Sequence, residues 1–227
     1  MSSTTKPAAN PAGTGGPPPI TAKLSPPPYT MGILPDFTRH DTPFTLRIRE
    51  LKMALGSDDF VIKNAVSRNK CFSVNGKLLS MSGKKTLHDY KGKALFEFCR
   101  TGFGLKKSYE GYQCGNSSKT LFTVEKVGYM NPKLNIVFKN VAGDGRLEKW
   151  TLRGRWLGGS SQITTDSGFV VASISRDYAN AGQILFNVQT YDVTVAPGVD
   201  VALISALCVC FDEAYHESNH GSKFQPF

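Results

Sequence analysis

A short run near the end of the chain restricts the possible folds more than any other stretch. Between residues 201 and 211 the only polar residue is Ser205. A helix formed by this run would be apolar around its whole circumference, and such a helix belongs inside a protein or inside a membrane. Eleven residues rise only about 16 Å, whereas crossing a bilayer takes roughly 20 apolar residues. We therefore expect no transmembrane segment, but a buried helix whose structural residues include Val201, Leu203, Ile204, Leu207, Cys208 and Phe211.

The chain before this run reads as a series of short strands. Apolar and polar residues alternate in many segments, and the breaks between them are rich in Gly, Asn and Asp. The candidate strands are 44–48, 71–74, 78–81, 94–99, 109–114, 119–126, 134–139, 147–152, 162–165, 169–175 and 183–195, with a hairpin turn expected at Asn75-Gly76. Strands at this spacing favour an antiparallel sandwich or barrel. Together with the apolar helix, they predict an all-β fold: a closed barrel with that helix threaded through its middle.

The N-terminal segment has a different composition. Residues 1–34 contain eight of the 13 prolines together with many Gly, Ser and Thr, which predicts a disordered, partly polyproline arm. Within it, Pro26, Pro27 and Tyr29 belong to a Pro-Pro-x-Tyr match, the kind of segment that docks on WW domains. The alternative is a low-complexity linker that contains a tyrosine. The predicted organisation is therefore an arm over residues 1–34, a barrel domain over 35–217 and a short polar tail over 218–227.

The cysteines and the first residues bear on localisation. Five cysteines at irregular spacing favour a reducing compartment over a disulfide framework. Residues 1–10 contain no apolar segment of the kind found in secretory signals. The expected localisation is cytoplasmic, with peripheral membrane attachment and the nucleus left open.

Several segments resemble the LURP-one-related family. The segments on which the resemblance rests are Tyr191-Asp192-Val193-Thr194-Val195-Ala196-Pro197-Gly198-Val199-Asp200, which leads into the apolar helix, Phe72-Ser73-Val74-Asn75-Gly76-Lys77, 82–89, 92–95 and 119–124. The resemblance covers roughly residues 44–217. It implies the tubby-like fold, a twelve-stranded barrel around a hydrophobic helix that tubby proteins share with phospholipid scramblases. Tubby domains bind phosphoinositides and scramblases act on lipid asymmetry, but the resemblance itself implies no settled activity.

Residues 216–220 spell His-Glu-Ser-Asn-His, a literal match to the zinc-binding H-E-x-x-H pattern. The match spans an expected helix end, and the seven residues after His220 contain no Asp, Glu or His for a third ligand. We therefore interpret it as a frayed polar terminus. With no catalytic motif recognised, we expect no enzyme activity, no metal and no cofactor.

The basic residues are the best candidate site in the sequence. The formal net charge is +9, which suits anionic surfaces. Alternation along 147–156 would place Trp150 and Leu152 on one face and a cationic stripe on the other. The candidate anion- or lipid-binding residues are Lys149, Arg153, Arg155, Lys84, Lys85, Lys106 and Lys107. The alternative is an ordinary solvated barrel exterior.

The function expected from these observations is a non-enzymatic intracellular binding module for phosphoinositides or anionic membrane surfaces. Two alternatives remain open: an adaptor recruited to a WW-domain partner, and scramblase-like lipid handling. Nucleic acid is a less favoured partner, to be tested through the salt dependence of binding.

Overall fold

The computed structural model describes residues 24–52, 58–76, 83–102, 108–128, 133–154, 160–175 and 190–220. The described elements are η1 (Pro35–Phe37), β1 (Phe44–Lys52), β2 (Asp58–Asn64), β3 (Lys70–Gly76), β4 (Lys85–Asp89), β5 (Ala94–Thr101), β6 (Ser108–Gln113), β7 (Asn116–Val127), β8 (Lys133–Lys139), β9 (Leu147–Gly154), β10 (Ser160–Thr165), β11 (Val170–Ser175), β12 (Thr190–Val195) and α2 (Val201–His220).

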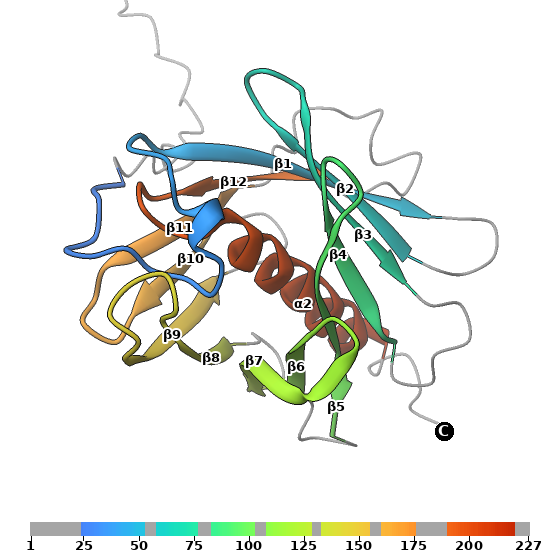
Figure 1. Cartoon of the computed structure of the whole chain (residues 1–227). Helices are drawn as coiled ribbons and strands as arrows, with labels where there is room; N and C mark the ends of the chain where they lie inside the picture. Colours follow the sequence, from blue (N-terminus) through green and yellow to red (C-terminus); the bar gives the residue numbers. More distant parts are fainter. Residues whose placement is uncertain are drawn as a thin grey trace, which may run out of the picture.

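The strands form one closed barrel around α2 (Figure 1). Each strand pairs antiparallel with its neighbours in the sequence, and β1 closes the ring by pairing with β12, with Leu46 opposite Val193. Closure leaves none of these twelve strands with an unpaired edge. The predicted all-β barrel around a C-terminal helix is confirmed.

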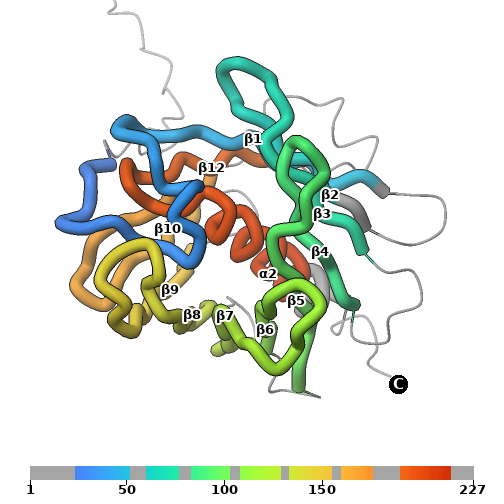
Figure 2. Tube along the Cα trace, in the orientation of Figure 1, coloured from blue at the N-terminus to red at the C-terminus, as the bar shows by residue number. Residues whose placement is uncertain are grey.

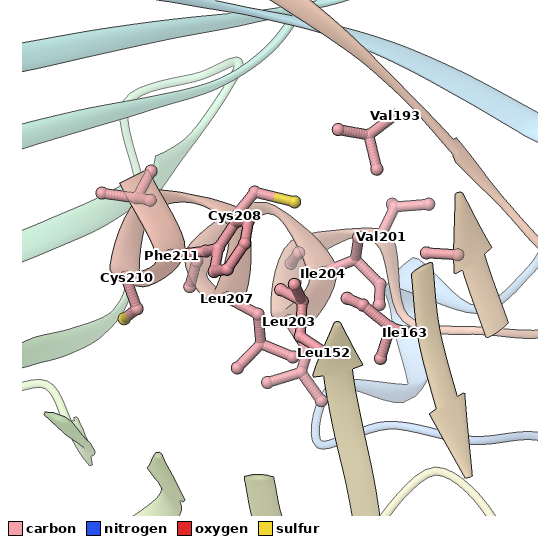
Figure 3. Packing of buried hydrophobic residues seen from close by; sticks show 14 of the residues in the cluster. Leu152, Ile163, Val193, Val201, Leu203, Ile204, Leu207, Cys208, Cys210 and Phe211 are labelled. Atoms are coloured by element: carbon pink, nitrogen blue, oxygen red, sulfur yellow. The ribbon is translucent and has the colours of Figure 1, made fainter. Parts of the chain in front are cut away.

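The inner face of the barrel follows from the period-two pattern of the strands. In β8, for example, Leu134, Ile136 and Phe138 are buried while the residues between them are partly exposed. The inward side chains meet the helix directly, and Figure 3 shows Leu152 and Ile163 beside Leu203 and Ile204. Helix residues are buried on all sides, including every one of the six predicted at the sequence level: Val201, Leu203, Ile204, Leu207, Cys208 and Phe211.

Several predicted elements need correction. β2 and β4 are absent from the strands that the sequence predicts. Asn75-Gly76 is not a turn, because both residues continue β3 and pair with Thr86 and Lys85 of β4. The predicted strand at 78–81 and the first part of the one at 183–195 lie outside the described residues. The helix continues to His220, so residues 218–220 are helical and not part of a tail.

The N-terminal segment crosses one end of the barrel beside the start of α2 (Figure 2). We refer to residues 24–34 as the strap. Its apolar side chains Leu24, Met31 and Ile33 are buried. Met31 makes a parallel bridge with Val199, in which its amide donates to the Gly198 carbonyl at 3.0 Å. The prediction of a disordered arm is therefore wrong for residues 24–34, while residues 1–23 lie outside the described part of the chain.

One buried carboxylate joins the strap to the helix. Oδ1 of Asp200 accepts hydrogen bonds from the amides of Ala202 and Leu203 at 2.9 and 3.1 Å, which makes Asp200 the N-cap of α2. Its Oδ2 accepts hydrogen bonds from the strap amides of Ile33 and Leu34 at 3.1 and 2.8 Å. Burial raises the pKa of Asp200 to about 6, against the opposing effect of these four amide donors.

Candidate functional site

The outer face of the barrel carries a cationic groove over β12, β1 and β2. Inward residues of β1 such as Leu46 and Ile48 are buried, so the residues between them point outward. Register brings Arg47 beside Lys63 of β2, and Arg49 beside Thr190 of β12. The groove encloses about 340 Å³ and is lined by Arg47, Arg49, Leu51, Val61, Lys63, Arg68 and Thr190.

Arg47 forms a fixed wall of this groove. Its Nε and Nη2 donate to Oδ1 and Oδ2 of Asp192, both at 2.7 Å, in the two-point geometry that suits guanidinium and carboxylate. This pair orients the guanidinium and offsets one positive charge. Arg47 therefore contributes shape to the groove more than charge.

Arg68 is held over the groove by a tight turn between β2 and β3. Oδ1 of Asn64 accepts hydrogen bonds from the amides of Val66 and Ser67, both at 2.8 Å, and the Arg68 amide donates to the Asn64 carbonyl at 3.0 Å. Arg68 has a φ of 64°, the left-handed conformation that costs a side-chain-bearing residue about 1–2 kcal/mol. A glycine would fit this backbone better, so an arginine at this position carries a cost in stability.

The remaining cations of the groove are available to a ligand. Within the described residues, no carboxylate lies within ion-pair distance of Arg49, Lys63 or Arg68, whose residues are all exposed. Leu51 and Val61 supply apolar surface to the same groove. Such a site favours an anion that carries more than one negative charge, because each cation contributes a charge-assisted hydrogen bond.

The structure describes two of the three residues of the predicted cationic stripe, both on β9. Its burial pattern alternates as expected, with Trp150 and Leu152 inward and Lys149 and Arg153 exposed. Arg155 lies outside the described residues, as do Lys106 and Lys107. Lys149 and Arg153 are therefore exposed outward cations, but they line neither the cationic groove nor the apolar pocket described below.

Lys84 and Lys85, two of the candidate anion-binding residues, do not form one exposed cationic pair. Lys85 points into the barrel, where its Nζ lies 3.0 Å from Oε1 of Glu213 on α2. Lys84 is on the outer side and its Nζ lies 2.5 Å from Oε2 of Glu97. Both charges are matched by carboxylates, and the sequence pattern alone did not reveal either partner.

The tyrosine of the Pro-Pro-x-Tyr segment is held by the barrel. The Tyr29 hydroxyl donates to Oε1 of Glu148 at 3.0 Å, and the Arg146 guanidinium lies 4.6 Å from the centre of the ring. Glu148 is buried and also accepts a hydrogen bond from Trp150 Nε1 at 3.2 Å. Burial, followed by the contact with Glu148, raises the pKa of Tyr29. A WW domain would have to remove Tyr29 from this clamp, whereas Pro26 and Pro28 are exposed.

All five residues of the H-E-x-x-H match, 216–220, belong to the last part of α2, so the expected frayed backbone is wrong. The side chains of these residues are not among those that the structure describes. Elsewhere in the described chain, no group of three or more His, Cys, Asp or Glu side chains could hold a metal ion. Of the described helices, none is long and apolar enough to cross a membrane.

Comparisons with known proteins agree with this architecture. A family model described as LURP-one-related matches residues 44–212. The Arabidopsis thaliana protein LURP-one-related 15 is 24% identical over 179 residues, which covers 77% of this chain and 82% of that protein. A crystal structure of a protein from Arabidopsis thaliana superposes with a TM-score of 0.58 at 22% identity, covering 80% of this chain and 96% of the other. The solved structure supports the fold, and the family match spans most of the barrel and α2: this chain belongs to the LURP-one-related family.

Proposed function

We propose that this chain is a non-enzymatic module that binds phosphate-bearing headgroups of an anionic membrane through the cationic groove. The observation that carries the proposal is the convergence of Arg49, Lys63 and Arg68 around one cavity of about 340 Å³. This volume lies within the range of small-ligand sites, roughly 300–1,000 Å³. The backbone positions of these cations are set by the fold, since Arg49 and Lys63 lie on paired strands and Arg68 lies in a hydrogen-bonded turn.

The chemistry of the groove favours a phosphate over a single carboxylate. Arginine forks and a lysine ammonium together can surround several phosphate oxygens. The apolar floor formed by Leu51 and Val61 suits the ring or glycerol part of a headgroup. The net charge of +9 adds a general attraction toward anionic lipid.

Two probes separate a membrane lipid from a free phosphate. The first is co-sedimentation with phosphatidylcholine vesicles with and without a phosphoinositide; the second is calorimetric titration with soluble inositol trisphosphate. Binding to both supports headgroup recognition, whereas binding only to the soluble compound would reassign the groove to a free phosphate ligand. Binding to neither would refute the proposal.

The groove is tested by a double variant, Arg49→Ala with Lys63→Ala. Each basic residue near an anionic surface contributes about 1 kcal/mol, so the pair should weaken vesicle binding about 30-fold. The matched control is Lys149→Ala with Arg153→Ala, two outward strand cations on β9. If the control loses as much affinity as the groove variant, the originally predicted stripe contributes equally and the groove has no special role.

Arg68→Gly separates binding from folding. It removes a cation and relieves the left-handed strain at φ 64°. We expect weaker vesicle and inositol trisphosphate binding with a free energy of unfolding that is unchanged or raised by up to about 1 kcal/mol.

A further inference from the structure

Two neighbouring turns at the strap end of the barrel carry exposed apolar tips. Val66, in the turn between β2 and β3, is 86% exposed, and Tyr90, in the turn between β4 and β5, is 63% exposed. A single exposed apolar residue needs no explanation. These two turns, however, are adjacent around the barrel because β3 pairs with β4, with Phe72 opposite Asp89.

Both turns lie beside aromatic residues at this end of the barrel. The Ala65 amide donates to the Thr45 carbonyl at 2.8 Å, which places the Val66 turn against the start of β1 at Phe44. Beside Tyr90 lies an apolar pocket of about 250 Å³, to which Phe37, Phe44 and Phe72 also contribute. Tyr90 therefore shares this pocket with the half-buried rings of Phe37 and Phe44, while the Val66 turn is hydrogen-bonded beside Phe44 at the same end of the barrel.

Positive charge surrounds these tips. The exposed cations are Lys63, Arg68, Lys70, Lys91 and Lys93. Three carboxylates lie at the same edge. Asp36 pairs with Arg39 at 2.8 Å, Asp89 accepts the backbone amides of Lys91 and Lys93 at 2.9 Å, and Asp41 is exposed, so the exposed cations outnumber the carboxylates here. An apolar tip within a cationic rim is complementary to an anionic bilayer, whose headgroups are negative and whose interior is apolar.

We propose that the two turns insert Val66 and Tyr90 into the interfacial layer of an anionic bilayer while the cationic groove holds a headgroup. The geometry supports this arrangement because Arg68 lines the groove and belongs to the same turn as Val66. Tyrosine suits the interface, since its ring is apolar and its hydroxyl is polar. The Asn64 side chain fixes the Val66 turn before binding, which reduces the entropy lost on insertion. This inference rests on the proposed function.

The test is a double variant, Val66→Ser with Tyr90→Ser, which removes apolar surface and adds no charge. Binding to phosphatidylcholine–phosphatidylserine vesicles should fall about tenfold or more, since an apolar side chain that leaves water contributes about 1.5–3 kcal/mol. The affinity for soluble inositol trisphosphate should not change. The matched control is Val141→Ser with Leu147→Ser, because these residues are 54% and 62% exposed near the β8–β9 turn, which lies at the same end of the barrel but across the ring from β3 and β4.

A direct readout of insertion is the emission of Val66→Trp. Vesicles should shift its maximum to shorter wavelength, beyond any shift of the wild type, and brominated lipid should quench it. Val141→Trp should show neither effect, and equal shifts at both positions would overturn the assignment to these two turns.

The two proposals fail in different ways. If the groove variant loses vesicle binding and the Val66–Tyr90 variant retains it, insertion is wrong and headgroup binding stands. If the groove variant retains inositol trisphosphate and vesicle binding, the proposed function itself is wrong. All substituted side chains are exposed, so thermal unfolding should show an intact fold in each case.

Discussion

Replacing Asp200 tests the junction between the strap and the central helix. Asp200→Ala removes the acceptor of four amides: two at the start of α2 and two from the strap. Losing the N-cap costs about 1 kcal/mol. Leaving the amides of Ile33 and Leu34 unsatisfied costs about 1–3 kcal/mol each. The free energy of unfolding should therefore fall by about 3–7 kcal/mol, as measured by urea denaturation.

Asp200→Asn separates the two halves of this junction. Asparagine keeps one oxygen for the helix amides but turns an NH₂ group toward the strap amides, where donors would face donors. The expected loss is about 2–3 kcal/mol, with faster hydrogen exchange at the amides of Ile33 and Leu34. Asp41→Asn, at an exposed position, is the matched control and should leave both quantities unchanged. A loss under about 1 kcal/mol for Asp200→Asn would refute the reasoning.

The same carboxylate predicts a dependence on pH. Burial raises its folded-state pKa to about 6, above the unfolded value. Its protonation therefore contributes stability that is fully present below about pH 4 and is lost as the pH rises through about 6. Asp200→Asn has no such titration. The difference in unfolding free energy between wild type and variant should grow by about 1 kcal/mol between about pH 7 and about pH 5.

Two further predictions concern the strap and the helix. A peptide covering residues 22–32 should bind a Pro-Pro-x-Tyr-specific WW domain about tenfold more tightly than the intact chain, because contacts with Glu148 and Arg146 hold Tyr29 in the chain. Arg146→Ala should bring the affinity of the intact chain closer to that of the peptide. Equal affinities of the peptide and the wild-type chain would contradict the view that the barrel holds Tyr29. Ala206→Asp places a carboxylate at a fully buried position in α2 and should lower the free energy of unfolding by about 4 kcal/mol or more, with loss of the cooperative melting transition. The control Ala94→Asp, at an exposed position, should leave the melting transition intact. A soluble Ala206→Asp variant with an unchanged melting temperature would refute the buried helix.

The features that the sequence predicted well are those encoded by a local pattern. The apolar circumference of residues 201–211 requires an enclosure whatever the rest of the chain does, and the alternation in β8 or β9 marks an inner face directly. β4 was missed because its Lys-Thr-Leu-His-Asp sequence contains only one large apolar residue, Leu87. The inward Lys85 is paired with Glu213 of α2, and this pairing exists only after folding.

The groove was missed for a related reason. Its cations come from β1, β2 and the following turn, and each is an ordinary exposed residue until the strands pair. The alternation of Arg47 and Arg49 about a buried Ile48 was the one available signal. The strap was misread because its proline content favours disorder, while its ordering depends on partners such as Asn140 and Asp200, 108 and 167 residues away in the chain.

The position of α2 after the last strand has a consequence for biosynthesis. A ribosome makes the β-strands first, so their inward apolar faces emerge before the helix that they enclose. The ring closes only when β12 pairs with β1, and the strap docks only on residues 198–200. The first described segments therefore stay without these partners until the end of the barrel sequence has been made. Nascent chains halted before residue 201 would therefore be prone to aggregation and dependent on chaperones, with native packing delayed until α2 is released.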